Sequence, residues 1–147
     1  MAVTAKQFLD MSPTELDNLF KTSPPGNIPV GKGRGTAIVD PDHKLGGLLA
    51  KFIHFFVWKG KVFDPVRGEL KNEITLLGLD RIKARVYRED SWFDAKECIV
   101  LDYSKTSLLA KKIRDEMREV SPGVYLGLVF WGRRRFLYFA LEFPQRG

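Results

Sequence analysis

The chain has 147 residues, 44% of them hydrophobic and 29% charged, which is typical of one globular domain large enough to bury a core. Its longest apolar run, residues 52–58, is far shorter than the ~20 residues of a membrane-spanning helix, so a spanned membrane is excluded. The net charge of +6 leaves attraction to an anionic ligand, nucleic acid or lipid open, although a solvated basic surface explains it more simply.

The first predicted element is a helix within residues 4–22. Ser12 and Glu15 have the spacing of a capping box, and a proline stands at the first helical position. Met11 and Leu16 are placed as the hydrophobic staple across this start. We therefore expect a short amphipathic helix that docks on the rest of the domain.

A connector rich in glycine and proline follows, over residues 22–35. Its run Gly31-Lys32-Gly33-Arg34-Gly35 has glycines like those of a phosphate-binding loop. Such loops lead directly into a helix, whose free N–H groups meet the anion. Residues 36–39 are strand-like instead, so we interpret the glycine run as a flexible entry into the first strand.

A second helix is predicted from Pro41 to Phe56, where apolar residues recur at helical spacing. We expect it to cover one end of the sheet. His54 lies among phenylalanines and is interpreted as a buried side chain. His43 has no second ligand at a recognisable spacing, so no metal site is expected.

The remaining chain reads as strands joined by short turns, which makes neighbouring strands antiparallel. The eight predicted strands are 35–39, 59–64, 69–77, 81–88, 96–103, 114–120, 124–131 and 136–143. Closure into an eight-stranded antiparallel up-and-down barrel would remove the exposed edges and leave room for one small ligand. A flat sheet with two helices on one face is the structural alternative. We predict a single domain, residues 1–147, with a helical segment and connector over 1–34 and the barrel over 35–143.

Two details stay open in the sequence. Strand 96–103 has apolar residues on both faces, so its inward face is not determined. Residues 108–120 fit a helix, or a short helix to Lys112 followed by a strand; we favour the strand because residues 121–123 form a short turn into the next one. As a strand, this segment would point either arginines or acids inward.

The C-terminal hairpin has strand-like apolar runs on both sides of an arginine-rich turn. We predict that Trp131 pairs with Phe136, which sets the register. That register places Tyr125 on the same face as Tyr138 and Glu142, with small residues opposite one another. A face of this kind, roomy and with polar tips, favours a pocket inside the curved sheet.

Residues 33–39, an apolar helix and then Trp58-Lys59-Gly60-Lys61-Val62-Phe63-Asp64 resemble the start of a bacterial family of lipocalin-like proteins. In that family a Gly-Trp-Gly motif and a W-x-G-K-x-F stretch open the barrel; Arg34 stands at the position of the first tryptophan. Residues 84–87 and 124–127 are similar to its later strands. The resemblance implies a calycin-type barrel with an apolar pocket, and no catalytic residues, since the family has no assigned activity.

We expect the barrel to bind a small hydrophobic or amphipathic molecule in its interior, without a cofactor. The expected lining consists of aromatic residues with a few polar groups among them. These residues are Trp58, Phe63, Asn72, Arg85, Tyr87, Arg118, Tyr125, Trp131, Tyr138 and Glu142.

The alternative is a small cofactor-independent enzyme, an isomerase, cyclase or hydrolase, that uses a buried carboxylate in the same pocket. Glu142, beside Tyr125, and Asp102 are the candidate catalytic residues. A third hypothesis is binding of nucleic acid or an anionic membrane through the basic surface. Nucleic acid is the less expected partner, because arginines at a hairpin tip also suit a strand edge that avoids aggregation.

The sequence contains one cysteine, Cys98, which has no partner for an internal disulfide. The N-terminal residues lack the apolar segment of a signal peptide. Together these features favour a cytoplasmic location. Both a monomer and a homodimer are compatible with the sequence.

Overall fold

The computed structural model describes residues 4–38, 61–64, 69–72, 82–103 and 112–144. The predicted helix over residues 41–56, with both histidines, lies outside these residues, as does Trp58. No helix in the described ranges is long and apolar enough to cross a membrane.

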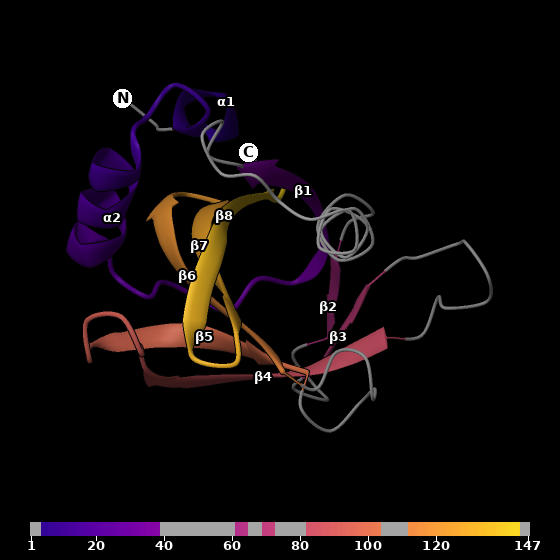
Figure 1. The fold of residues 1–147 in the computed structure, drawn as a ribbon. Coiled ribbons are helices and arrows are strands. Elements are labelled where there is room, and N and C mark those ends of the chain that lie inside the picture. The colour runs from indigo at the N-terminus through magenta and orange to yellow at the C-terminus, as the bar shows by residue number, and fades with distance from the viewer. Residues whose placement is uncertain (1–3, 39–60, 65–68, 73–81, 104–111, 145–147) are drawn as a thin grey trace, which may run out of the picture.

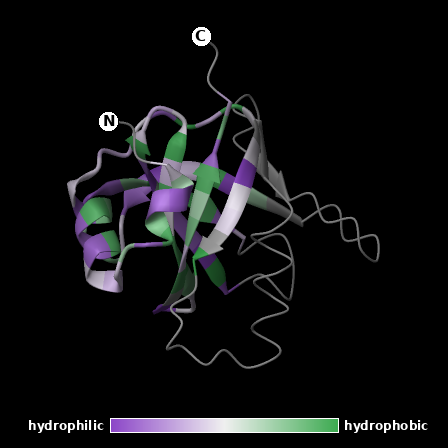
Figure 2. Cartoon of the chain, turned by 90° about the horizontal axis from the view of Figure 1, so that it is seen from above, coloured by the Kyte–Doolittle hydropathy of each residue, from purple (hydrophilic) through white to green (hydrophobic). Residues whose placement is uncertain are grey.

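Two short helices open the chain, α1 (Ala5–Phe8) and α2 (Pro13–Thr22). The predicted capping box is confirmed: the Glu15 N–H donates to Ser12 Oγ at 3.1 Å, and the Ser12 N–H donates to Glu15 Oε1 at 3.2 Å. The helix is amphipathic, with Leu16 and Phe20 buried on one side. Figure 2 shows hydrophobic and hydrophilic residues alternating around it.

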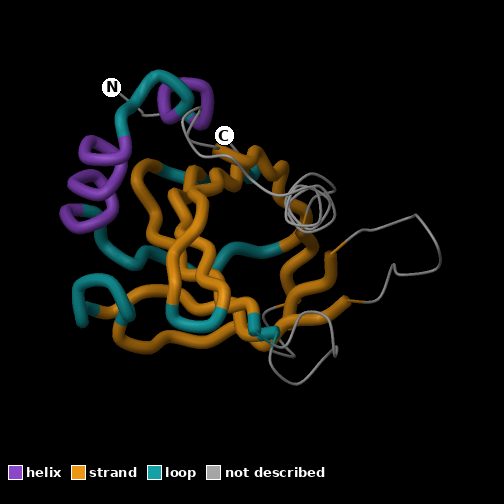
Figure 3. The backbone as a smooth tube through the Cα atoms, viewed as in Figure 1, coloured by secondary structure: helices purple, strands orange, loops and turns teal. Residues whose placement is uncertain are grey.

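The rest of the described chain is a sheet of antiparallel strands (Figures 1 and 3). The strands are β1 (Gly31–Ile38), β2 (Lys61–Asp64), β3 (Glu69–Asn72), β4 (Ile82–Asp90), β5 (Glu97–Asp102), β6 (Ile113–Ser121), β7 (Val124–Trp131) and β8 (Arg134–Glu142). Each strand pairs with the next, and β1 also pairs with β8, so the pairings run through all the strands and return to β1. The predicted mainly β, antiparallel architecture is confirmed.

The first strand begins earlier than predicted, because it includes the glycine run. Gly31–Gly33 pairs with β2, and Arg34–Ile38 pairs with β8. Gly33 is needed there for space, since a Cβ atom at this position would lie 2.4 Å from the Phe143 ring. The glycine run is therefore part of the sheet, and its interpretation as a flexible entry was wrong.

The sheet is buried on both faces of β5–β8. The face turned away from the helices carries what we call the inner cluster. It consists of Ala84, Val86, Ile99, Leu101, Tyr103, Ile113, Met117, Tyr125, Val129, Leu137, Phe139 and Leu141. The opposite face packs against α1 and α2 in what we call the helix-side cluster. It consists of Ala5, Phe8, Leu16, Phe20, Ile38, Cys98, Val100, Leu126, Leu128, Phe130 and Ala140.

The two open details of the sequence have clear answers. Residues 113–121 form a strand, as favoured, whereas residues 104–111 lie outside the described ranges. In β5, Ile99 and Leu101 belong to the inner cluster, while Cys98 and Val100 face the helices. Both faces of β5 are buried, which explains why the apolar residues of its sequence did not show which face is turned inward.

The register of the C-terminal hairpin differs from the prediction by one residue along most of its length and by two residues next to the turn. Val129 pairs with Leu137, and after a bulge Trp131 pairs with Arg134 instead of Phe136. The bulge and a two-residue turn at Gly132, where φ is +61°, set this register. Tyr125 consequently faces the inner cluster, whereas Tyr138 and Glu142 belong to the opposite face.

Candidate ligand-binding site

The inner face of β6 carries two acids, Asp115 among apolar residues and the half-buried Glu119 near the end of the strand. Asp115 is 3% exposed and lies between Ile113 and Met117 along the strand, with Leu101 and Val129 as its partners on the neighbouring strands. Tyr103 is fully buried in the same cluster. A carboxylate is costly to bury unless it is paired or hydrogen-bonded, and Asp115 does have an interaction partner. The segment therefore points two acids inward and its arginines outward.

One end of the inner cluster is covered by the connector between α2 and β1. The Tyr125 hydroxyl donates to the Asn27 carbonyl, and Ile28 packs against the cluster. The Phe143 ring meets the Tyr125 ring edge to face, with centroids 5.6 Å apart. Burial raises the pKa of Tyr125 well above its ordinary value, so this hydroxyl stays a neutral donor.

Tyr138, predicted to line the pocket, instead holds α2 on the sheet. Its hydroxyl donates to Asp17 Oδ1 at 2.6 Å, and Arg135 forms an ion pair with the same carboxylate at 2.9 Å. Burial, and then the hydrogen bond to Asp17, raise the pKa of Tyr138 to about 12. The side chain therefore lies on the helix side of the sheet, away from the inner cluster.

Arg118 is also a structural residue. Its side chain is 1% exposed and donates five hydrogen bonds, all within 3.1 Å. Two go to the Asp94 carboxylate, one to the Phe20 carbonyl at the end of α2, and two to carbonyls at the start of β5. Every N–H of the guanidinium group is satisfied, so Arg118 has no donor left for a ligand.

The other predicted pocket residues are spread over different faces. Glu142 is half-buried opposite Val124, so it does not share a face with Tyr125. Trp131 and Arg85 are exposed. Phe63 and Asn72 lie in β2 and β3, where Phe63 pairs with Leu70 and Asn72 with Ile82. The expected pocket lining is therefore not brought together among the residues whose side chains are described.

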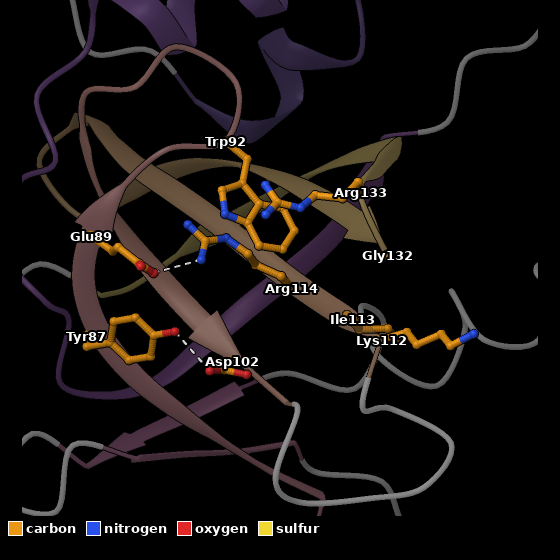
Figure 4. A pocket seen from close by; sticks show the side chains of 9 residues that line it. All are labelled: Tyr87, Glu89, Trp92, Asp102, Lys112, Ile113, Arg114, Gly132 and Arg133. Atoms are coloured by element: carbon orange, nitrogen blue, oxygen red, sulfur yellow. Dashed lines mark hydrogen bonds and ion pairs between the residues drawn. The ribbon is translucent and has the colours of Figure 1, made fainter.

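Two of the predicted residues do meet at a cleft on the helix-side face of the sheet, which we call the outer cleft (Figure 4). It has a volume of about 550 Å³, and its lining includes Tyr87, Glu89, Trp92, Asp102, Arg114 and Arg133. The Tyr87 hydroxyl donates to Asp102 at 2.9 Å. Burial, and then this hydrogen bond, raise the pKa of Tyr87 to about 12.

The wall of the outer cleft is built on a buried acid. Glu116 is fully buried and accepts hydrogen bonds from the Ser91 hydroxyl, the Trp92 N–H and Arg114 Nε. Arg114 Nη1 also pairs with Glu89 at 2.8 Å. This network fixes the turn before β5 against β6, and with it the position of the Trp92 side chain.

Trp92 is stacked with two arginines from distant parts of the chain. The guanidinium carbons of Arg114 and Arg133 each lie 4.2 Å from the centre of its ring. Such cation–π contacts contribute ~0.5–1 kcal/mol each at exposed sites. The sequence analysis missed Trp92, Glu89, Arg114 and Arg133 as site residues. The only sequence signal was the same-face charge pattern of Arg114, Glu116 and Arg118.

Metal binding has no support within the described ranges, where no three His, Cys, Asp or Glu side chains gather closely enough to hold an ion. Cys98 is buried beneath the helices, and burial raises the pKa of its thiol to about 12. A thiol of this kind is a poor nucleophile and a poor metal ligand.

No family model and no curated protein matches this chain. Among solved structures, it is similar to a protein from Thermomonospora curvata, with a TM-score of 0.65 and 18% sequence identity. The alignment covers 96% of this chain and 99% of that one. At this identity the likeness concerns the fold, which the two proteins share over almost their whole lengths.

Proposed function

We propose that the chain is an eight-stranded up-and-down barrel of the lipocalin-like type that binds a small hydrophobic or amphipathic molecule in its interior. The observation that carries the proposal is Asp115, a buried carboxylate between the apolar side chains of Ile113 and Met117 on the inner wall. Ligand pockets have this composition: mostly apolar, with a few polar groups that fix orientation. The return of the strand pairings to β1 supports closure around such a pocket.

The two ends of the inner cluster differ in what covers them, and this difference predicts the orientation of a bound ligand. Ile28, Tyr125 and Phe143 cover one end. Asp115 lies near the other end, two residues from the start of β6. An amphipathic ligand would enter at that end, leave its polar group near Asp115, and extend its apolar part toward Met117 and Phe139.

The first experiment is mass spectrometry of the purified protein for a co-purified apolar compound, followed by titration with a fluorescent fatty-alcohol probe, whose hydroxyl group can donate to the Asp115 carboxylate. We expect saturable binding at micromolar concentration. Asp115→Asn should weaken binding of a probe with a polar head group about fivefold or more. The matched control is Asp102→Asn, on the opposite face, which should leave the affinity unchanged. Absence of both a co-purified compound and saturable probe binding contradicts the proposal.

Catalysis by a carboxylate is the second candidate, favoured by the Tyr87–Asp102 hydrogen bond in the outer cleft. Asp102 replaces Glu142 as the first choice, because Glu142 does not share a face with Tyr125. For any substrate that is found, Asp102→Asn should abolish turnover while Glu142→Gln retains it. Equal turnover in Asp102→Asn and the parent protein contradicts this candidate.

Binding of nucleic acid or anionic membrane through the basic surface is the third candidate. Its test is oligonucleotide binding at increasing salt, since neutralisation of several phosphates makes affinity fall steeply with salt.

A further inference from the structure

The outer cleft is a second site, separate from the proposed interior pocket. Three of its groups form one stack and come from different segments: Trp92 from the turn before β5, Arg114 from β6, and Arg133 from the turn before β8. Tyr87 and Lys112 also line the cleft. Figure 4 shows the three side chains together, with Tyr87 and Asp102 on the other side of the cleft. The inner cluster lies on the opposite face of the same strands, and only its Ile113, at the start of β6, also borders the cleft among the described residues.

The arginines of the cleft differ in how their charges are used. Arg114 is paired with Glu89 and Glu116 and donates to the Asp90 carbonyl, so its charge is balanced within the protein. Arg133 is exposed, and no carboxylate in the described part of the chain lies within ion-pair distance of it. Its guanidinium group therefore has its N–H donors available to an anion.

Trp92 offers a ring that a ligand can share. Its side chain is 39% exposed at the cleft, held from behind by an edge-to-face contact with Phe130 at 5.5 Å. Arg133 covers the ring from an exposed two-residue turn. Stacking of a flat ring on an aromatic side chain is roughly twice as strong as an exposed cation–π contact, so a planar ligand can displace this arginine.

We propose that the outer cleft binds a planar aromatic anion whose ring stacks on Trp92 and whose single carboxylate or phosphate pairs with Arg133. The fork of the guanidinium group matches either anion with two parallel hydrogen bonds. A volume of about 550 Å³ suits a ligand of this size. Glu89 and Asp102 also line the cleft, so a polyanion is disfavoured there.

The experiment is a titration followed by the tryptophan indole N–H signals in a ¹H–¹⁵N spectrum, with Trp92 assigned from Trp92→Phe. The probes are 2-naphthoate for the carboxylate and adenosine monophosphate for the phosphate. Uncharged 2-naphthol and inorganic phosphate test the ring and the anion separately. We expect one or both anionic probes to shift the Trp92 signal saturably, at least fivefold more tightly than 2-naphthol, phosphate or adenosine triphosphate.

Arg133→Ala should weaken binding of the anionic probe at least fivefold, and should not weaken binding of 2-naphthol, which no longer has to displace the guanidinium group. The matched control is Arg134→Ala, which removes the same charge from the neighbouring exposed position outside the cleft lining and should change affinity less than twofold. The proposal is overturned by any of three results: equal losses of affinity in Arg133→Ala and Arg134→Ala, tighter binding of adenosine triphosphate than of the monophosphate, or no saturable shift of the Trp92 signal with either anionic probe up to 10 mM. The interior proposal is tested separately, because the uncharged fatty-alcohol probe should bind equally to Arg133→Ala and the parent protein.

Discussion

At the scale of single residues, the buried charges serve the structure before any ligand. Arg118 joins the end of α2 to the turn at Asp94 and the adjoining start of β5, which are far from α2 in the sequence. Its ring contact with Phe20, at 4.3 Å, adds packing to these hydrogen bonds. Because all its N–H groups are bonded within the protein, Arg118 can be fully buried, and for the same reason it has no donor to offer a ligand.

Arg118→Met is predicted to lower the free energy of unfolding by about 3 kcal/mol or more, because it leaves the Asp94 carboxylate buried without its partner. Urea denaturation measures the change. The free energy of unfolding of Arg118→Lys should lie between those of the parent protein and Arg118→Met. An ammonium group keeps the charge but lacks the fork that meets both carboxylate oxygens. Arg85→Met is the control at an exposed position and should stay within about 0.5 kcal/mol of the parent. A similar loss in both methionine variants contradicts the role given to Arg118.

The same pair makes stability depend on pH. The hydrogen bond from Arg118 holds the pKa of Asp94 below its ordinary value in the folded protein. A carboxylate with a lowered folded pKa contributes stability above its unfolded pKa of about 3.9, and that contribution is lost as the pH falls through the folded value. Unfolding free energies measured from pH 6 to pH 2 should fall below about pH 4. The slope should be shallower in Asp94→Asn, and an unchanged slope contradicts this account.

At the scale of elements, the sequence predicted local features well and register poorly. The capping box of α2 is a local pattern, and the strands of 124–131 and 136–143 followed from dense apolar runs. Register depends on which face is buried, and both faces of β7 and β8 are buried. The bulge after Val129 has no sequence signal of its own.

Gly127 shows what the true register requires. It stands opposite Phe139, and a Cβ atom at this position would lie 2.1 Å from the Phe139 ring. Gly127→Ala should therefore cost about 1–3 kcal/mol of stability through overpacking. Adding Phe139→Leu should recover part of that loss in a double-mutant cycle of thermal or urea unfolding. Additive effects of the two changes would mean that these residues do not press on each other.

The cleft residues were missed for a related reason. Trp92, Arg114 and Arg133 come together through the pairing of β5, β6 and β7, and none is near another in the sequence. The alternating charges of β6 indicated a polar face, but not which turn would cover it. Local sequence patterns predict single helices and strands. A site assembled from three of these elements can be predicted only when the pairing register of the strands is known.

At the scale of the whole molecule, the chain has two clusters on the two faces of one sheet. The helices seal one face through apolar contacts, and through Asp17 with Arg135 and Tyr138 at their edge. This leaves the inner face for the proposed pocket. The helix-side face also carries the outer cleft (Figure 4).

Cys98 lies between β5 and the helices, and it is the sole sulfhydryl of the chain. Native protein should react with a thiol reagent such as dithionitrobenzoate at least a hundredfold more slowly than urea-unfolded protein. Phe20→Ala should speed up the native reaction, since it removes a ring from the helix-side cluster. Met117→Ala, in the inner cluster, should speed up the native thiol reaction less than Phe20→Ala when the two variants lose the same stability. Equal reaction rates in the two variants would mean that the thiol reports global unfolding alone. If the difference holds, undocking of the helices can be timed by one colour-forming reaction, without attaching any label.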